Sequence, residues 1–354
     1  MSFQSITLKN YRSYTAASFE FGSGVSIIIG PNASGKTNLL EAVHIVCSGS
    51  SFRVSDKDLV KNNSEWARID ALVNGEERIL KLQNGSPRVK KTFEINGTTK
   101  TRLAYENIIP NVLFDPDDIR IIGGSPERRR DYLDNLLSTI SPYYKKSLSS
   151  YKRALKQRNN LLKSGGSASH VFPWNIVLSR HAEILVNERI RVINNINERI
   201  TSIYQKLSSQ NENIDIHYSL QISSGQYGAH YLKKLEHNFE IDRLKGFTSY
   251  GPHRDDFSIE INTRSASTHA SRGEARTITL ALKIIEMLLI EDVRGQPPLL
   301  LLDDVFSELD GTRRRTLTEF LKDHQCIITT TDADVVGKSF NKLVELISIQ
   351  PTLE

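Results

Sequence analysis

The chain has 354 residues, of which 38% are hydrophobic, and a formal net charge of +5. This length allows one large or two ordinary globular domains, and the charge is too small to indicate nucleic-acid binding by itself. The apolar runs are far shorter than the roughly 20 residues that span a bilayer, and the N-terminus lacks a secretory signal, so we expect a cytoplasmic protein without a membrane partner. Cys47 and Cys326 have no metal-ligand spacing and are expected to be small buried side chains.

The first 120 or so residues show the patterns of short strands and turns. Strands are predicted at residues 27–29, 69–73 and 91–95, because these stretches are rich in β-branched or apolar side chains. A helical pattern begins at Thr37. This part of the chain is therefore expected to be mixed α/β.

Helical spacing dominates from Pro126 onward. Residues 127–163 and 173–207 carry apolar side chains three and four positions apart, and the turn-forming segment 164–169 separates them. Strand and turn patterns return after about residue 245. A helix is predicted over 274–290 and an apolar strand at 299–302, so the α/β part resumes there.

The fold class predicted from these patterns is α/β, with an ATPase head of the ABC P-loop type and an inserted, mainly helical second domain. The head comprises residues 1–124 and 246–354, with the segment 270–276 near the junction of its lobes. Residues 125–245 form the helical arm, which is at least a hairpin. No internal repeat is found.

The most specific motif is a phosphate-binding loop. It satisfies the spacing G-x-x-x-x-G-K-[ST] and lies between an apolar strand and a helix. Glycines let the backbone N–H groups and the helix N-terminus approach phosphate, and the lysine adds mobile positive charge. The alternative is a glycine-rich turn that only caps a helix. The residues predicted to bind nucleotide are Gly30, Pro31, Asn32, Ala33, Ser34, Gly35, Lys36, Thr37 and Asn38.

Two carboxylates follow the apolar strand 299–302. Asp303 fits the Mg²⁺-side carboxylate of a Walker B strand, and Asp304 is placed to orient or deprotonate the attacking water. The hydroxyl of Thr37 would be the second protein ligand of Mg²⁺. An ordinary strand end with two solvated acids is the alternative, which the P-loop makes less plausible. We predict ATP and Mg²⁺ as cofactors.

A third motif opens the helix before this strand. The segment 270–274 (Ala-Ser-Arg-Gly-Glu) resembles the signature of ABC ATPases, in which Ser271 and Gly273 would meet nucleotide bound to a second copy. Taken alone, Ser-x-x-Glu is more often a helix N-cap. Its position about 30 residues before the Walker B strand favours the signature. The segment 307–310 resembles the D-loop of the same class.

Further segments narrow the resemblance to one family. Residues 8–14 resemble the opening of chromosome and DNA-repair ABC proteins, in which an arginine, here Arg12, approaches the nucleotide. The segments 123–130, 155–162 and 250–256 resemble hallmarks of the RecF family of bacterial recombination mediators, and the resemblance covers nearly the whole chain. It implies weak ATP hydrolysis as a dimerisation switch, an ATP-dependent homodimer, and binding to DNA where single strand meets duplex. The implied partners are RecO and RecR, with loading of RecA as the outcome.

The chain departs from the wider ABC pattern in two places. No glutamine of a Q-loop is found near residues 110–117, where Val112 holds the place, and no switch histidine follows Ile328, where residues 329–332 (Thr-Thr-Thr-Asp) stand. These departures speak against the ATP-binding subunit of a transporter, the main rival. Another SMC-like ATPase is a closer alternative. A small-molecule P-loop kinase would need neither the signature nor Asp304.

The positive charge of the chain is concentrated in the helical arm. Residues 127–163 contain ten Lys and Arg but three Asp and Glu, with Tyr143, Tyr144 and Tyr151 interleaved. Such a face could bind DNA phosphates and stack bases, or it could be an ordinary solvated helix surface. For His253 and its neighbours Arg254 and Asp255, we favour a structural role over catalysis. The candidate DNA-binding residues are Arg128, Arg129, Arg130, Lys152, Arg153, Lys156 and Arg158.

Overall fold

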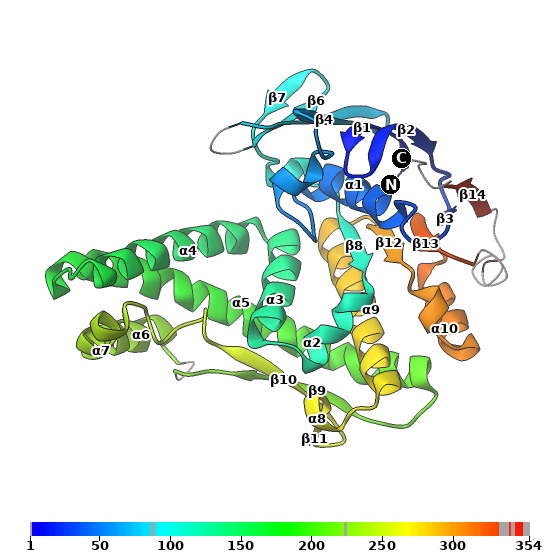
Figure 1. Cartoon of the computed structure of the whole chain (residues 1–354). Helices are drawn as coiled ribbons and strands as arrows, with labels where there is room; N and C mark the ends of the chain where they lie inside the picture. Colours follow the sequence, from blue (N-terminus) through cyan, green and yellow to red (C-terminus); the bar gives the residue numbers. More distant parts are fainter. Residues whose placement is uncertain (1, 86–88, 223–224, 333–339, 341–343, 350–354) are drawn as a thin grey trace. The chain divides into compact units, whose positions relative to one another are not determined.

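The computed structural model describes residues 2–85, 89–222, 225–332, 340 and 344–349 (Figure 1). The chain divides into two compact units. The first contains the residues up to Asp118 together with those from Glu286 onward, and the second is Ile119–Ile285. The predicted class, an α/β ATPase head with an inserted and mainly helical part, is confirmed.

The first unit contains two sheets and the helices that pack on them. A six-stranded antiparallel sheet has the order β2-β1-β4-β5-β6-β7, and a five-stranded parallel sheet has the order β14-β3-β13-β12-β8. The elements are β1 (Phe3–Tyr11), β2 (Tyr14–Glu20), β3 (Val25–Ile29), α1 (Lys36–Ser48), β4 (Trp66–Val73), β5 (Glu76–Gln83), β6 (Lys90–Ile95), β7 (Thr98–Lys100), β8 (Asn111–Phe114), β12 (Leu299–Asp303), α10 (Gly311–Leu321), β13 (Cys326–Thr330) and β14 (Val344–Ser348), with short 3-10 turns at Asp56–Leu59, Tyr105–Asn107, Pro116–Ile119 and Phe306–Glu308.

The parallel sheet explains the leucine run of the sequence. Strand β12 lies between β13 and β8, and every residue of Leu299–Asp303 is buried. A central parallel strand is covered on both faces, so it is apolar throughout rather than alternating. Its carboxyl end, where the charge begins, therefore lies at the same sheet edge as the loop that follows β3.

Helix α1 is covered by both sheets. Its buried side chains, from Leu39 to Cys47, belong to one hydrophobic core with residues of β1, β4, β5, β12 and β13. Cys47 and Cys326 are both fully buried, as expected. The antiparallel strands turn tightly at Asn74-Gly75 and Asn96-Gly97, which have the positive φ angles that such two-residue turns require.

The second unit is a long helical hairpin with a small sheet. Its elements are α2 (Arg120–Gly123), α3 (Pro126–Ile140), α4 (Pro142–Lys163), α5 (Ala168–Ser208), β9 (Ile214–Ser219), α6 (Tyr227–His237), α7 (Phe239–Lys245), β10 (Asp256–Ile261), β11 (Arg264–Ser265), α8 (Ala266–His269) and α9 (Arg272–Arg294), the last of which crosses the unit boundary. Helices α4 and α5 pack side by side, and the predicted three-and-four repeat from Ile193 to Leu207 is the buried face of α5.

The boundary of the units differs from the one expected from the sequence. Residues 246–285 were assigned to the head, but they belong to the second unit. The reason is strand pairing: β10 is bonded along its whole length to β9, which lies within the predicted arm. The helical periodicity of the arm does not reveal this single strand, so the return of strand patterns after residue 245 looked like a return to the head.

Candidate nucleotide site

The phosphate-binding loop has the context that the sequence predicts. It connects β3 to α1, and Gly35 directly before the helix has a φ of +98°, which favours glycine. A Cβ on Gly30 would lie 2.6 Å from Ser34 Oγ and 2.7 Å from a backbone oxygen, so only glycine fits there. Pro31, Asn32 and Ala33 are exposed, whereas Ser34 and Lys36 are buried.

Lys36 closes the loop on itself. Its Nζ donates to the backbone oxygens of Gly30 and Pro31, at 2.7 and 2.8 Å. Burial lowers the pKa of Lys36, and the neighbouring carboxylates of Asp304 and Asp303 partly oppose this shift. The ammonium is thus held over the loop by two backbone carbonyls, which gives it a defined position.

The Walker B carboxylate is joined directly to the P-loop helix. Thr37 Oγ1 donates to both carboxylate oxygens of Asp303, at 3.0 and 2.9 Å, and Thr329 Oγ1 donates to Asp303 Oδ1 at 2.6 Å. Thr329 is the penultimate residue of β13, in the segment where the wider ABC pattern has its switch histidine. One hydroxyl and one carboxylate meeting at a sheet edge are oxygen ligands of the kind that Mg²⁺ prefers.

Asp304 has an unusual backbone and an orphaned oxygen. Its φ is +50°, and its backbone N donates to Thr329 O and Oγ1 at 3.1 and 3.0 Å. Among the described residues, its Oδ1 is buried without a hydrogen-bond partner. A buried, unpaired carboxylate oxygen costs free energy unless something binds it, so the residues present fit a site that takes a metal-bound or attacking water.

No group of three or more His, Cys, Asp or Glu within the described ranges is placed to hold a metal ion.

The turn between β1 and β2 packs against the P-loop. Tyr14 OH donates to Gly35 O at 3.0 Å, and Asn38 Nδ2 donates to Ser13 Oγ at 3.0 Å. Arg12 lies in this turn with a φ of +52°. The arginine that the family resemblance assigns to the nucleotide therefore lies in a turn that touches the start of α1.

Arg12 forms an ion pair that the sequence did not reveal. Its Nε lies 3.0 Å from Glu41 Oε2, and Glu41, on α1, is fully buried. Tyr11 OH and Ser51 Oγ also donate to this carboxylate, at 3.3 and 2.5 Å. Burial and the nearby Glu41 raise the pKa of Tyr11. The sequence signal for this ion pair is the acid within the apolar run Leu39 to Val43, because a buried charge requires a partner.

The strand-end position beside Asp303 belongs to Asp115. Strand β8 pairs with β12 so that Phe114 is opposite Leu302, and Asp115 and Asp303 follow at the same edge. Burial raises the pKa of Asp115, and the carboxylates of Asp118 and Asp303 add to the effect. Val112, which we expected in the place of the Q-loop glutamine, is instead buried within β8.

The signature residues open helix α9 in the second unit. Ser271 and Gly273 are exposed. Ser271 N donates to Glu274 Oε2 at 2.6 Å, and Glu274 N donates to Ser271 Oγ at 3.3 Å. This is a reciprocal capping box. The cap occupies a lone pair of the Ser271 hydroxyl and leaves its O–H free to donate elsewhere.

The structure corrects the list of DNA-binding candidates at Arg158. This side chain is fully buried in the second unit, where it pairs with Asp242 at 2.8 Å and bonds to Asn175. Tyr144 and Tyr151, offered as stacking platforms, are buried too, whereas Tyr143 is 61% exposed. A helical period alone does not show which face of α4 is turned inward.

The other candidate DNA-binding residues differ in their exposure and in the bonds that they form within the chain. Arg129 pairs with Asp256 at 2.7 Å, and Arg130 donates to the backbone of Asp255. Lys152 lies 3.7 Å from Asp134 but is 61% exposed. The remaining candidates are exposed: Arg128, Arg153 and Lys156.

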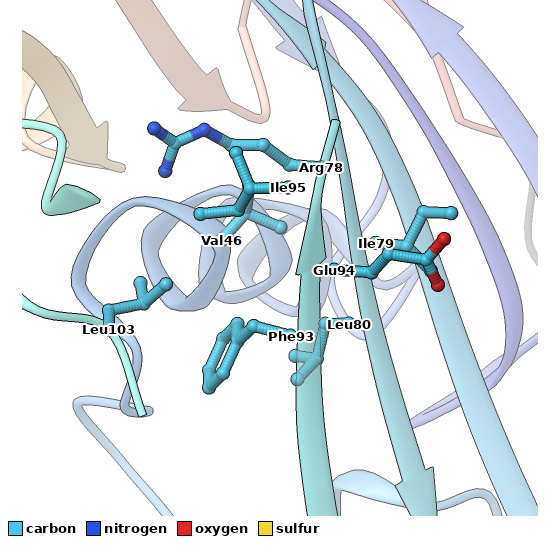
Figure 2. Close-up of a pocket in the computed structure, with 8 residues that line it drawn as sticks. All are labelled: Val46, Arg78, Ile79, Leu80, Phe93, Glu94, Ile95 and Leu103. Carbon is cyan, nitrogen blue, oxygen red and sulfur yellow. The ribbon is translucent and has the colours of Figure 1, made fainter. Parts of the chain in front are cut away.

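A small pocket in the first unit is not a nucleotide site. It lies at the C-terminal end of α1, away from the P-loop end of that helix, and Figure 2 shows its mostly apolar walls. With ≈ 10 Å³ of free space it has room for about one water. It is lined by Val46, Arg78, Ile79, Leu80, Phe93, Glu94, Ile95 and Leu103.

The parallel sheet, the loop after β3 and the two carboxylates at the end of β12 define the class of protein: the nucleotide-binding head of an ABC-type P-loop ATPase. The model of the RecF/RecN/SMC N terminal domain matches residues 2–353, and the chain belongs to this family. The DNA replication and repair protein RecF of Clostridium beijerinckii is 35% identical over 99% of this chain and 97% of its own length. The protein of that name from Natranaerobius thermophilus is 34% identical over 96% and 95%.

Solved structures agree with this assignment. The recombination mediator protein RecF-ATPrS of the RecFOR pathway aligns with a TM-score of 0.86 and 29% identity, covering 99% of this chain and 98% of that one. The Smc head domain of Pyrococcus furiosus, bound to the C-terminal domain of ScpA, aligns with a TM-score of 0.53 and 18% identity, which reflects a shared fold.

Proposed function

We propose that this chain is an ATP-dependent DNA-binding protein of replication and recombinational repair, in which two copies close around ATP and hydrolyse it slowly. The observation that carries the proposal is the hydrogen bond between Thr37 and Asp303, because it joins the two halves of a Mg²⁺-triphosphate site. The names and nucleotides of the relatives support the same role.

The nucleotide would lie along the P-loop. The backbone N–H groups of residues 30–38 other than Pro31, which has none, bind the phosphates together with the start of α1, and Lys36 adds positive charge near the β- and γ-phosphates. Thr37 and Asp303 would hold Mg²⁺, which neutralises charge on the phosphates when bound. Arg12, fixed by Glu41, contributes a cation at the α1 side of the loop.

Asp304 is the group proposed to act on water. Its unpaired Oδ1 can accept a hydrogen bond from a water and orient it, or take its proton. Thr329 fixes the backbone of Asp304 and the carboxylate of Asp303, so it orders both acids. The proposed arrangement does not use a switch histidine. We propose that ATP hydrolysis by this site is slow.

Dimerisation is proposed because the signature is exposed. Ser271 and Gly273 present a free hydroxyl and backbone groups at the start of α9, and their proposed ligand is the γ-phosphate of ATP held by another copy. ATP would then bias a monomer–dimer equilibrium, since each nucleotide binds two copies better than one.

DNA contact is proposed on the exposed face of α4. Lys146, Arg153, Lys156 and Lys163 are exposed, and their spacings of seven, three and seven residues place them along one stripe of the helix. Contacts of this kind fix position on the backbone without reading sequence. We further propose, from the resemblance, binding at single-strand/duplex junctions, action with RecO and RecR in RecA loading, and a cytoplasmic location.

The ATP-binding subunit of a transporter is the rival function. Among the described residues, no helix has the length and apolar character to cross a membrane. The test is light scattering after gel filtration, with a non-hydrolysable ATP analogue and with or without gapped DNA. The parent should become a dimer, and Ser271→Arg should bind nucleotide but stay monomeric. Ser267→Arg, at another exposed serine, is the matched control. A parent that stays monomeric in all conditions contradicts the proposal.

A further inference from the structure

The segment Phe247–Arg254, between α7 and β10 of the second unit, is a loop in which the middle is largely buried and the two ends are exposed. Thr248, Gly251 and Pro252 are buried, yet Phe247 and Arg254 at its two ends are exposed. This loop contains most of the segment 250–256 that the sequence singled out. The proposed ATP chemistry uses none of its side chains.

Two buried arginines hold the loop from below. Arg158 donates to Thr248 Oγ1 at 2.7 Å and is neutralised by Asp242. Arg189 donates to Pro252 O at 2.7 Å and is neutralised by Asp134.

Buried tyrosines complete the support. Tyr231 OH donates to Tyr250 O at 2.9 Å. His253 Nε2 faces Thr248 O at 3.1 Å, so it carries the proton, and Nδ1 accepts from Tyr151 OH at 2.7 Å. The loop backbone is therefore fixed by hydrogen bonds at several points.

Such a support is costly for a surface loop. Each buried ion pair loses more hydration than its Coulomb attraction commonly returns, so its benefit is conformational definition. The side chains that the fixed backbone displays are the ones for which a precise position matters. They are Phe247, Tyr250 and Arg254.

The displayed side chains form two cation–aromatic pairs. The guanidinium of Arg254 lies 5.0 Å from the centre of the Phe247 ring, which is 39% exposed. Lys234 Nζ lies 4.4 Å from the centre of the Tyr250 ring. An exposed ring and a planar cation in contact are a surface on which another flat π system can stack.

The surroundings favour an anionic ligand. Between residues 227 and 254 there are five Lys and Arg and three Asp and Glu. One of these acids, Asp242, is already neutralised by its ion pair with the buried Arg158. Lys233 and Lys245 are exposed on the adjoining helices, and Lys163 packs against Gly246. Cations around stacking rings match a single strand of nucleic acid, which offers unpaired bases and phosphates together.

We propose that this loop binds unpaired nucleotides of single-stranded DNA, with a base stacked on Phe247 and Arg254 and the phosphates on the neighbouring lysines. The inference rests on the proposed DNA-binding function and adds the place where unpaired bases would be held. A duplex, whose bases are already stacked, would gain little from this surface.

The test is fluorescence anisotropy on the full chain with a labelled oligo(dT) of about 15 nucleotides and a duplex of equal length. Phe247→Leu should weaken single-strand binding about tenfold while changing duplex binding less than about twofold. Phe247→Tyr, which keeps a ring, should retain parent affinity. Leu244→Ala, at a more exposed apolar position of α7, is the matched control and should change neither affinity.

The variant Arg254→Gln distinguishes a loss of base stacking from a loss of folding. It should also weaken oligo(dT) binding, and its thermal unfolding should match that of the parent because Arg254 is exposed. Unchanged single-strand affinity in Phe247→Leu and Arg254→Gln, with a parent that binds both DNAs, overturns this inference alone. A parent that binds neither DNA overturns the proposed function and this inference with it.

Discussion

The hydroxyl of Thr37 donates to both carboxylate oxygens of Asp303, although 266 residues separate them. The contact exists because β3 and β12 are strands of one parallel sheet, with β13 between them, and their carboxyl ends meet at one edge. It places the first hydroxyl of α1 and the Walker B carboxylate where one ion can bind both.

Lys36→Met should weaken ATP binding at least tenfold. The variant removes a cation that charge-assisted hydrogen bonds would join to phosphate, and such bonds contribute about 1.5–3 kcal/mol each. Isothermal titration with ATP and with ADP measures the change. Lys9→Met, at an exposed lysine of β1, is the control. Equal affinities in parent and Lys36→Met are incompatible with the P-loop assignment.

Asp304→Asn should bind ATP normally but hydrolyse it about 100-fold more slowly or worse, because a positioned general base contributes a factor of this order. Phosphate release gives the rate, and gel filtration should show an ATP-bound dimer that persists. A variant with parent turnover would move the base to another residue. Asp115, at the adjacent strand end, is then the next to test.

Arg12→Ala should destabilise the first unit by about 2 kcal/mol, because it leaves the buried Glu41 carboxylate without its cation while Tyr11 and Ser51 still donate to it. In Arg12→Ala/Glu41→Gln the buried charge is gone, and much of the stability should return. Urea unfolding of the parent, Arg12→Ala, Glu41→Gln and the double variant measures this coupling.

Nucleotide affinity then separates the two roles of Arg12. If Arg12 contacts ATP, the double variant recovers stability but not affinity. Recovery of both would show that Arg12 acts on the fold alone.

The stripe on α4 should account for part of the salt dependence of duplex binding. Changing Arg153, Lys156 and Lys163 to Gln removes up to three phosphate contacts, so the slope of log K against log salt should become shallower by about 2–3. Affinities between about 50 and 200 mM salt give the slope. A parent-like slope would mean that DNA is bound on another surface.

The second unit should respond to acid through two opposed groups. Burial lowers the pKa of His253 to about 4, so the stability it contributes is present above its unfolded value near 6.5 and is lost as pH falls toward 4. Burial raises the pKa of Asp255 to about 6, so its contribution is largest below its unfolded value near 3.9 and is lost as pH rises through 6.

Replacing either group should reveal the pH dependence of stability that the other group causes. Asp255→Asn should lose more stability than the parent between pH 6.5 and 4, and His253→Gln should gain stability over the same range. Urea midpoints at pH 7 and pH 5 are the measurement. Parallel pH profiles for all three proteins would show that neither group changes its protonation on folding.

Local patterns in the sequence determined most of the nucleotide site. The strand before Gly30, the helix after Gly35 and the apolar run that ends at Asp303 are each encoded by neighbouring residues, so their types and order follow from spacing. The capping box of Ser271 with Glu274 is also local, and it confirms the helix N-cap interpretation of that motif, whereas the signature interpretation stays a prediction.

Tertiary structure decided what the charged side chains do. Arg158 looks like a DNA-binding residue in sequence, yet it is a fully buried partner of Asp242. The carboxylate of Glu41 pairs with Arg12, a partner that the sequence does not identify. The unit boundary differs from the predicted one for a similar reason, since β9 and β10 pair although their partner residues are 37 or more positions apart. Burial and strand pairing depend on residues distant in the chain, and no local pattern specifies which face of a helix those residues will cover.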